Sequence, residues 1–205
     1  YEYIKKKVNS WKIDFIFING DVLGENEVRE GYGFNYNKTL FNASLDKQNM
    51  LKNIAPNYEN LLKIRQVYER GIKRQDVDLE MSFYIKQYVE YRYDDLFEIL
   101  KKISLIKPIY FNIGTMESPL HYNILKELSF LIEVPESYIR SIATLSNYRD
   151  TFKEFLKKIN DKSLKNLNYI GGSTKIIKET LFAAIPGLNN SSGLTDSTSE
   201  FQEKL

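Results

Sequence analysis

Histidine and cysteine, two residue types often used for acid–base and nucleophilic chemistry, are scarce in this sequence. The chain contains one histidine, His121, and no cysteine. A histidine can act as a general base, but no cysteine is present to pair with it and no serine lies in a nucleophile-elbow motif. The lack of cysteine also excludes disulfides, thiol catalysis and cysteine-ligated zinc. We therefore interpret His121 as a structural or surface residue.

Two further features could suggest chemistry, namely an aspartate pair and two glycine-containing stretches. Asp94 and Asp95 are adjacent, and such a pair could bind a metal ion, but aspartates at a helix start usually satisfy free amide groups. The stretches GYG (residues 31–33) and YIGGSTK (residues 169–175) lack the spacing of a P-loop. We interpret these features as a helix cap and turns. The sequence thus assigns no catalytic residue, predicts no cofactor and favours a non-enzymatic role.

Three stretches follow one another in an order that resembles metal-dependent nucleases of the PIN/NYN type. They are FINGD, RQDVDLEM and IYFNIGTMESPL. The resemblance implies carboxylates at strand ends that gather Mg²⁺ or Mn²⁺ to activate water against a phosphodiester. Asp78 and Glu117 would be the metal ligands, whereas Asn19 stands where an aspartate is expected. A degenerate nuclease fold of this type is one alternative.

The stretch LKELSFLIEVPESYIRSIATL (residues 125–145) resembles the helix-turn-helix of DNA-binding regulators. Ser129 stands where a small residue is needed between the helices, and Glu133 stands at the turn position that usually holds glycine because the backbone is left-handed there. The resemblance implies a nucleic-acid-binding helix pair over residues 119–145. Simple packing of two helices is the favoured interpretation, because Arg140 alone is basic on the second helix. The predicted core positions are Leu128, Ile132, Val134, Ile139 and Ile142.

Basic residues near aromatic ones are a further candidate for contact with nucleic acid. Such groups hold RNA or single-stranded DNA through backbone charge and stacking. The spacing of Glu59 and Lys63 indicates ordinary surface pairing on a helix instead. Lys5 to Lys7 form another group, as do the lysines at 157, 158, 162 and 165. The residues predicted to contact RNA or DNA are Lys63, Arg65, Arg70, Lys73, Arg74 and Arg140.

Composition indicates a folded chain of nearly balanced charge. The 205 residues are 42% hydrophobic and include 15 tyrosines. The chain has 29 basic and 27 acidic side chains, for a net charge of +2. A dedicated nucleic-acid binder usually has a larger excess of positive charge. No run reaches the roughly 20 apolar residues needed to span a bilayer. We therefore expect a soluble chain without membrane insertion in a cytoplasmic, virion or organellar setting, and the lack of cysteine favours a reducing compartment.

The hydrophobic pattern predicts a mainly α fold with a small β component (α+β), of about six helices and two to four short strands. Strands are expected over residues 12–18 and at IYFNI (residues 109–113). Helices are expected to begin at Asn57, at Asp76, at Asp94 or Asp95 and at Ser118–Pro119, and to continue through ESYIRSIAT and YRDTFKEFLKKI. The predicted domains are a single one over residues 1–170 and a region over 171–205, with a short amphipathic helix at TKIIKETLFAAI and a polar docking tail.

These features together predict a non-enzymatic subunit of a larger assembly such as a virion, a ribonucleoprotein or an organellar complex. Tyrosine keeps one polar and one apolar end, which suits large contact surfaces. The tail is rich in Ser, Asn, Thr and Gly and would dock on other protein subunits as an extended peptide. Its predicted partner-binding residues are Ile185, Leu188, Leu194 and Phe201.

Overall fold

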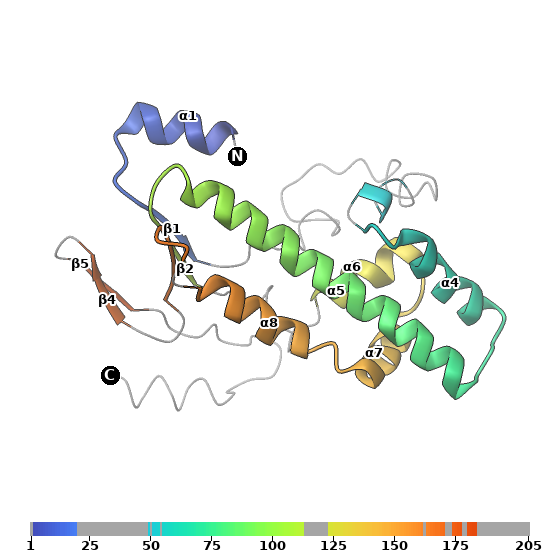
Figure 1. Ribbon diagram of the computed structural model, residues 1–205. Coiled ribbons are helices and arrows are strands. Elements are labelled where there is room, and N and C mark those ends of the chain that lie inside the picture. Colours follow the sequence, from blue (N-terminus) through green and yellow to red (C-terminus); the bar gives the residue numbers. More distant parts are fainter. Residues whose placement is uncertain are drawn as a thin grey trace. The chain divides into compact units, whose positions relative to one another are not determined.

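The computed structural model describes residues 2–19, 49, 51–53, 55–112, 123–161, 163–170, 174–177 and 180–183. Over these residues the chain is mainly helical with a small parallel sheet, so the α+β prediction is confirmed (Figure 1). The chain divides into two compact units. We call residues 1–22, 96–121 and 156–205 the sheet unit, and residues 23–95 and 122–155 the helical unit.

The sheet unit is built on three parallel strands in the order β1-β2-β3. They are β1 (Ile16–Asn19), β2 (Ile109–Asn112) and β3 (Leu167–Tyr169), and Ile109 of β2 is in register with both Ile16 and Leu167. Parallel neighbours need long crossover connections, so the paired strands lie far apart in the sequence. Helix α1 (Glu2–Trp11) precedes β1 and buries Val8.

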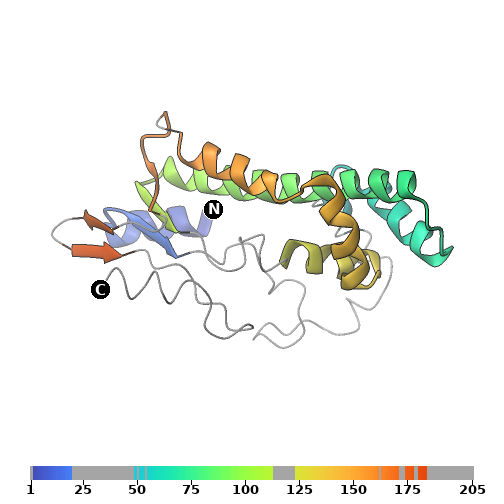
Figure 2. The ribbon, with the colours of Figure 1, turned by 90° about the horizontal axis from the view of Figure 1, so that it is seen from below.

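The helical unit contains α4 (Tyr58–Glu69), the first part of α5 (Gln75–Ser104), α6 (Asn123–Ile132) and α7 (Glu136–Ala143). A 3-10 turn, η2 (Thr144–Ser146), leads to the first turns of α8 (Asp150–Ile159). These turns run along α5 in both views, where Phe155 stacks on Tyr93 with ring centroids 5.1 Å apart (Figures 1 and 2). Apolar residues at helical spacing form the buried core of this unit.

The predicted helix break at Asp94 or Asp95 is wrong, because α5 is one continuous helix of 30 residues. Both aspartates are exposed in its middle, where Asp95 pairs with Arg92. The buried stripe continues through Tyr88, Arg92 and Leu96, so core packing extends the helix past its polar residues.

The predicted helix at residues 174–185 is also wrong where the structure describes it. Strands β4 (Thr174–Ile177) and β5 (Thr180–Ala183) form an antiparallel pair (Figure 2). In its register, Ile177 is the partner of Thr180. β-Branched Thr and Ile residues recur in this stretch and favour strands over helices. Helix α1 and strand β3 were not expected, whereas the strand at IYFNI is confirmed as β2.

None of the helices in the described ranges is long and apolar enough to cross a bilayer. The division into a domain over residues 1–170 and a tail over 171–205 stays a prediction.

Candidate functional site

Three of the six basic residues predicted to contact nucleic acid form ion pairs within the helical unit. Arg65 on α4 donates to Glu69 at 2.8 Å and also to Glu133, and both carboxylates raise the pKa of this guanidinium. Arg74 donates to Asp76 at 2.8 Å, and Arg140 on α7 donates to Glu136. Much of the positive charge at these positions is therefore offset by neighbouring carboxylates.

The other three predicted residues lie on α4 and in the turn that follows it. The Lys63 ammonium stands 5.6 Å from the centroid of the Tyr84 ring. Arg70 and Lys73 are exposed and form no ion pair with any residue that the structure describes. The residues of the helical unit nevertheless number fifteen basic and seventeen acidic. Contact of this surface with nucleic acid stays a prediction.

Of the two predicted metal ligands, Asp78 and Glu117, the structure describes only Asp78, so it does not bring the pair together. Asp78 lies half-buried in the first turn of α5, and burial together with the Asp78 charge raises the pKa of Tyr138. Glu117 lies outside the described residues, as does His121. Within the described ranges, no three His, Cys, Asp or Glu side chains lie close enough to hold a metal ion.

The helix-turn-helix-like stretch forms two helices, α6 and α7, joined by a tight turn. Glu133 has a φ of 57°, so the left-handed position anticipated from the sequence is occupied by glutamate. The Ser129 hydroxyl donates to the Val134 carbonyl at 2.7 Å and closes the turn. The half-buried Tyr138 of α7 packs against α4, with its ring centroid 4.9 Å from that of Tyr68. The five predicted core positions are all buried: Leu128, Ile132, Val134, Ile139 and Ile142.

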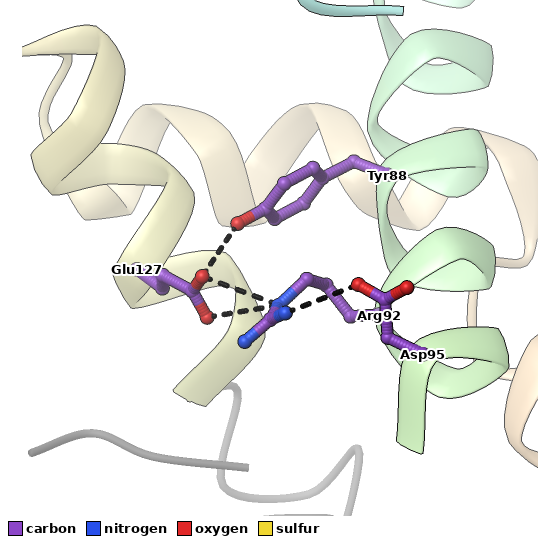
Figure 3. Close-up of polar contacts among 4 residues, drawn as sticks. All are labelled: Tyr88, Arg92, Asp95 and Glu127. Carbon is purple, nitrogen blue, oxygen red and sulfur yellow. Dashed lines mark hydrogen bonds and ion pairs between the residues drawn. The ribbon is translucent and has the colours of Figure 1, made fainter. Parts of the chain in front are cut away.

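A buried polar network joins α5 to α6, and sequence reasoning did not find it (Figure 3). The Tyr88 hydroxyl donates to the Glu127 carboxylate at 2.9 Å, and Arg92 Nε lies 3.2 Å from the same carboxylate. The Arg92 guanidinium also approaches Asp95 at 3.5 Å. Tyr88, Arg92 and Glu127 are all buried. Because both oxygens of Glu127 face donors, this geometry suits an anchor between two helices rather than proton transfer.

A cluster of exposed apolar side chains lies on the same unit, and we call it the apolar cluster: Leu79, Phe83 and Leu145. Their exposed fractions are 43%, 51% and 50%. Leu79 and Phe83 are neighbours one turn apart on α5. The Ser146 hydroxyl donates to the Ser82 carbonyl at 2.9 Å, which fixes η2, and with it Leu145, beside this turn of α5.

No protein-family model, curated protein or solved structure matches this chain. Its function must therefore be inferred from the geometry of its own residues. The predicted partner-binding residues Ile185, Leu188, Leu194 and Phe201 lie outside the described residues.

Sequence signals existed for the sites that were missed. Glu127 falls between Ile124 and Leu131 on the apolar side of α6, where a charged residue must find a partner if it is buried. Leu79 and Phe83 lie off the stripe of Met81, Ile85 and Tyr88, and the helical period of 3.6 turns them outward.

Burial raises the pKa of the Tyr88 hydroxyl well above its ordinary value of 10.0, and the Glu127 charge adds to this effect. The folded protein therefore holds Tyr88 protonated at pH values where the unfolded chain loses this proton. Its contribution to stability is complete below pH about 10 and is lost as the pH rises further.

We expect a Tyr88→Phe variant to lose stability less steeply above pH about 10 than the unchanged protein does. The difference in slope should approach about 1.4 kcal/mol per pH unit, the limit for one proton. Urea unfolding followed by circular dichroism between pH 7 and 11 measures it. Tyr91→Phe, at a half-buried position on the same helix, is the matched control. Parallel pH profiles for Tyr88→Phe and the unchanged protein would contradict the expectation.

Proposed function

We propose that this chain is a non-enzymatic subunit of a larger macromolecular assembly and binds a partner protein through the apolar cluster. The observation that carries the proposal is the exposure of Leu79 and Phe83 one turn apart on α5 together with that of Leu145 on η2, which the Ser146–Ser82 hydrogen bond ties to this turn. Single exposed apolar residues are ordinary on protein surfaces, whereas a group of them marks an interaction site. Phe83 is the aromatic member of the group, and large aromatic side chains are typical of the residues that dominate binding energy.

The charges around the apolar cluster favour a protein over a polyanion as its occupant. Both signs occur close together: Asp150 accepts from Lys153 at 2.8 Å, and Lys153 and then Lys86 lower the pKa of Asp150. Glu80 lies one residue from Leu79 and accepts from Tyr84. A mixed polar rim around an apolar centre is the usual anatomy of a protein interface. The fitting partner therefore presents apolar side chains and a rim of both charges.

The tail from about Ile185 is proposed as a second docking element on the same or another subunit. This part of the proposal rests on composition, because the tail is rich in Ser, Asn, Thr and Gly with apolar residues at intervals.

A photo-crosslinking amino acid at position 83 should capture one defined protein in the source cells. Adding Leu79→Ser and Leu145→Ser to that chain should reduce the crosslinked product at least about tenfold. Fully burying a leucine side chain contributes about 1.5–3 kcal/mol, and each of these half-exposed side chains would bury its remaining half on binding, so the two together account for about 1.4 kcal/mol or more. The same two substitutions should change the free energy of unfolding by less than about 1 kcal/mol, because both side chains are already half exposed. Mass spectrometry identifies the product.

A crosslinker at Arg70 provides the control, since that side chain is exposed in the turn after α4 and belongs neither to the apolar cluster nor to its polar rim. Equal capture from positions 83 and 70, or capture that survives both serine substitutions, would refute the apolar cluster as the docking site. A crosslink to a second copy of the chain would replace the proposed partner with a homo-oligomer.

A further inference from the structure

The two units differ in charge, and the sheet unit is the positive one. Its residues include fourteen lysines and ten acidic residues, and all of its basic residues are lysines. Its described side chains include ten lysines but only three carboxylates, those of Asp14, Glu98 and Asp161. A local positive field of this kind attracts anionic polymers even when the net charge of the whole chain is small.

Three of these lysines precede the three strands of the parallel sheet, at the end of the sheet where the strands begin. We call them the lysine edge: Lys12, Lys107 and Lys165. Each precedes a strand: Lys12 precedes β1, Lys107 precedes β2, and Lys165 precedes β3. Because the strands are parallel and in register, their amino ends meet at the same edge. None of the three ammonium groups forms an ion pair with a residue in the described part of the chain. Asp14 is the described carboxylate nearest in sequence to this edge.

Lys12 occupies a backbone position that usually belongs to glycine. Its φ is 53°, and the amide of Ile13 donates to the Val8 carbonyl at 3.4 Å, so Lys12 closes α1 in a left-handed conformation. A side chain in this conformation is strained, and strained residues gather at functional positions. The fold thus tolerates strain at a position where a positive charge is placed beside the sheet.

One face of the sheet carries aromatic rings next to the lysine edge. Phe17 and Tyr110 are register partners and Asn168 is the partner of Tyr110, so the three share a face. Phe17 is 37% exposed, and the Phe15 ring meets Tyr110 edge-on at 5.6 Å. The opposite face is buried through Ile109, Phe111 and Leu167.

Helix α1 adds a second exposed aromatic ring, with a lysine against it. Trp11 is 64% exposed, and the Lys7 ammonium stands 4.7 Å from its ring centroid. Lys5 and Lys6 are exposed, whereas Val8 is buried. The described outward side chains of α1 are therefore lysines and one indole ring.

We propose that the sheet unit binds single-stranded nucleic acid, with phosphates on the lysine edge and the lysines of α1, and with bases on Trp11 and Phe17. Lysine is a point charge suited to phosphate contact without sequence reading. Stacking on an aromatic ring requires an unpaired base, which a duplex does not offer. A membrane surface fits less well, because an interfacial helix needs a broad apolar face and Val8 is turned into the unit.

The test uses the full chain and a fluorescein-labelled 20-nucleotide oligo(U), with anisotropy measured from 50 to 300 mM NaCl. The Lys12→Gln, Lys107→Gln, Lys165→Gln variant should bind at least about tenfold more weakly at low salt. The slope of log K against log salt should fall by about 2, since each lost phosphate contact removes about 0.7 on a single strand. Trp11→Ala should weaken binding about five- to a hundredfold and leave the salt slope unchanged.

The matched control is Lys63→Gln, Lys73→Gln, Arg74→Gln in the helical unit, which should leave the affinity within about twofold. A larger loss from this control than from the lysine-edge variant would overturn the proposal. So would tighter binding of a 20-base-pair duplex than of oligo(U), or binding to vesicles of phosphatidylserine and phosphatidylcholine without binding to oligo(U). Circular dichroism melts of every variant show whether a loss of binding reflects a loss of folding.

Discussion

Replacing Glu127 with alanine is expected to lower the free energy of unfolding by about 3–5 kcal/mol. The substitution leaves the Arg92 guanidinium buried with Asp95 at 3.5 Å as its remaining partner in Figure 3, and it removes the acceptor of the Tyr88 hydroxyl. A buried charge that loses a buried carboxylate partner costs more than the intact pair contributes, because less of its desolvation is then offset. Equilibrium urea unfolding at neutral pH measures the effect.

Removing all of the polar partners together should be much less harmful. A Tyr88→Phe, Arg92→Met, Glu127→Met variant keeps similar side-chain volumes and removes the three buried polar groups together, while Asp95, which loses Arg92 as a partner, is exposed to solvent. We therefore expect a loss of less than about 2 kcal/mol. A triple variant as unstable as Glu127→Ala would show that the network itself, rather than the unpaired charge, provides the stability. We infer that the network mainly fixes the alignment of α6 on α5.

The extent of α5 shows where sequence reasoning succeeded and where it failed. The stripe of Met81, Ile85 and Tyr88 was correctly predicted to be helical. The break at Asp94 was wrong because aspartate at a helix start and aspartate on an exposed helix face look alike in sequence. The buried stripe continues through Arg92 and Leu96, and this continuation shows that Asp94 lies on an exposed helix face rather than at a helix start. To predict it from the sequence, one has to accept a charged residue, Arg92, at a core position.

Turns and strand pairing show a second limit. Three described α-helices and the 3-10 turn η2 are followed by a left-handed residue. Gly71 and Asn147 are residue types that favour this conformation, whereas Lys12 and Glu133 are not. Glu133 could be anticipated because the helix-turn-helix-like pattern requires that conformation. The lysine edge could not be anticipated, because Lys12, Lys107 and Lys165 come together only through parallel pairing of distant strands. Such pairing is set by tertiary packing and leaves little local signal.

The two proposed surfaces have different physical characters, and each lies in its own unit. The apolar cluster of the helical unit suits a protein partner, and the lysine edge and aromatic face of the sheet unit suit a phosphate backbone. A chain that holds both kinds of partner would serve in a ribonucleoprotein-like assembly. This joint role rests on both proposals, and the crosslinking and anisotropy experiments test them separately.

Phe155→Ala is expected to lower the free energy of unfolding by about 3–5 kcal/mol, because it opens a cavity in the core of the helical unit. The Phe155 ring is buried, stacks on Tyr93 at 5.1 Å and lies 6.3 Å from Phe152, so few neighbours can move to fill the space. Phe155→Leu keeps most of the volume and should cost about 1–1.5 kcal/mol. Phe152→Ala should cost less than Phe155→Ala, since Phe152 is only half-buried. Urea unfolding ranks the three variants, and equal losses for Phe155→Ala and Phe152→Ala would mean that the stack on Tyr93 is not the contact that secures α8 to α5.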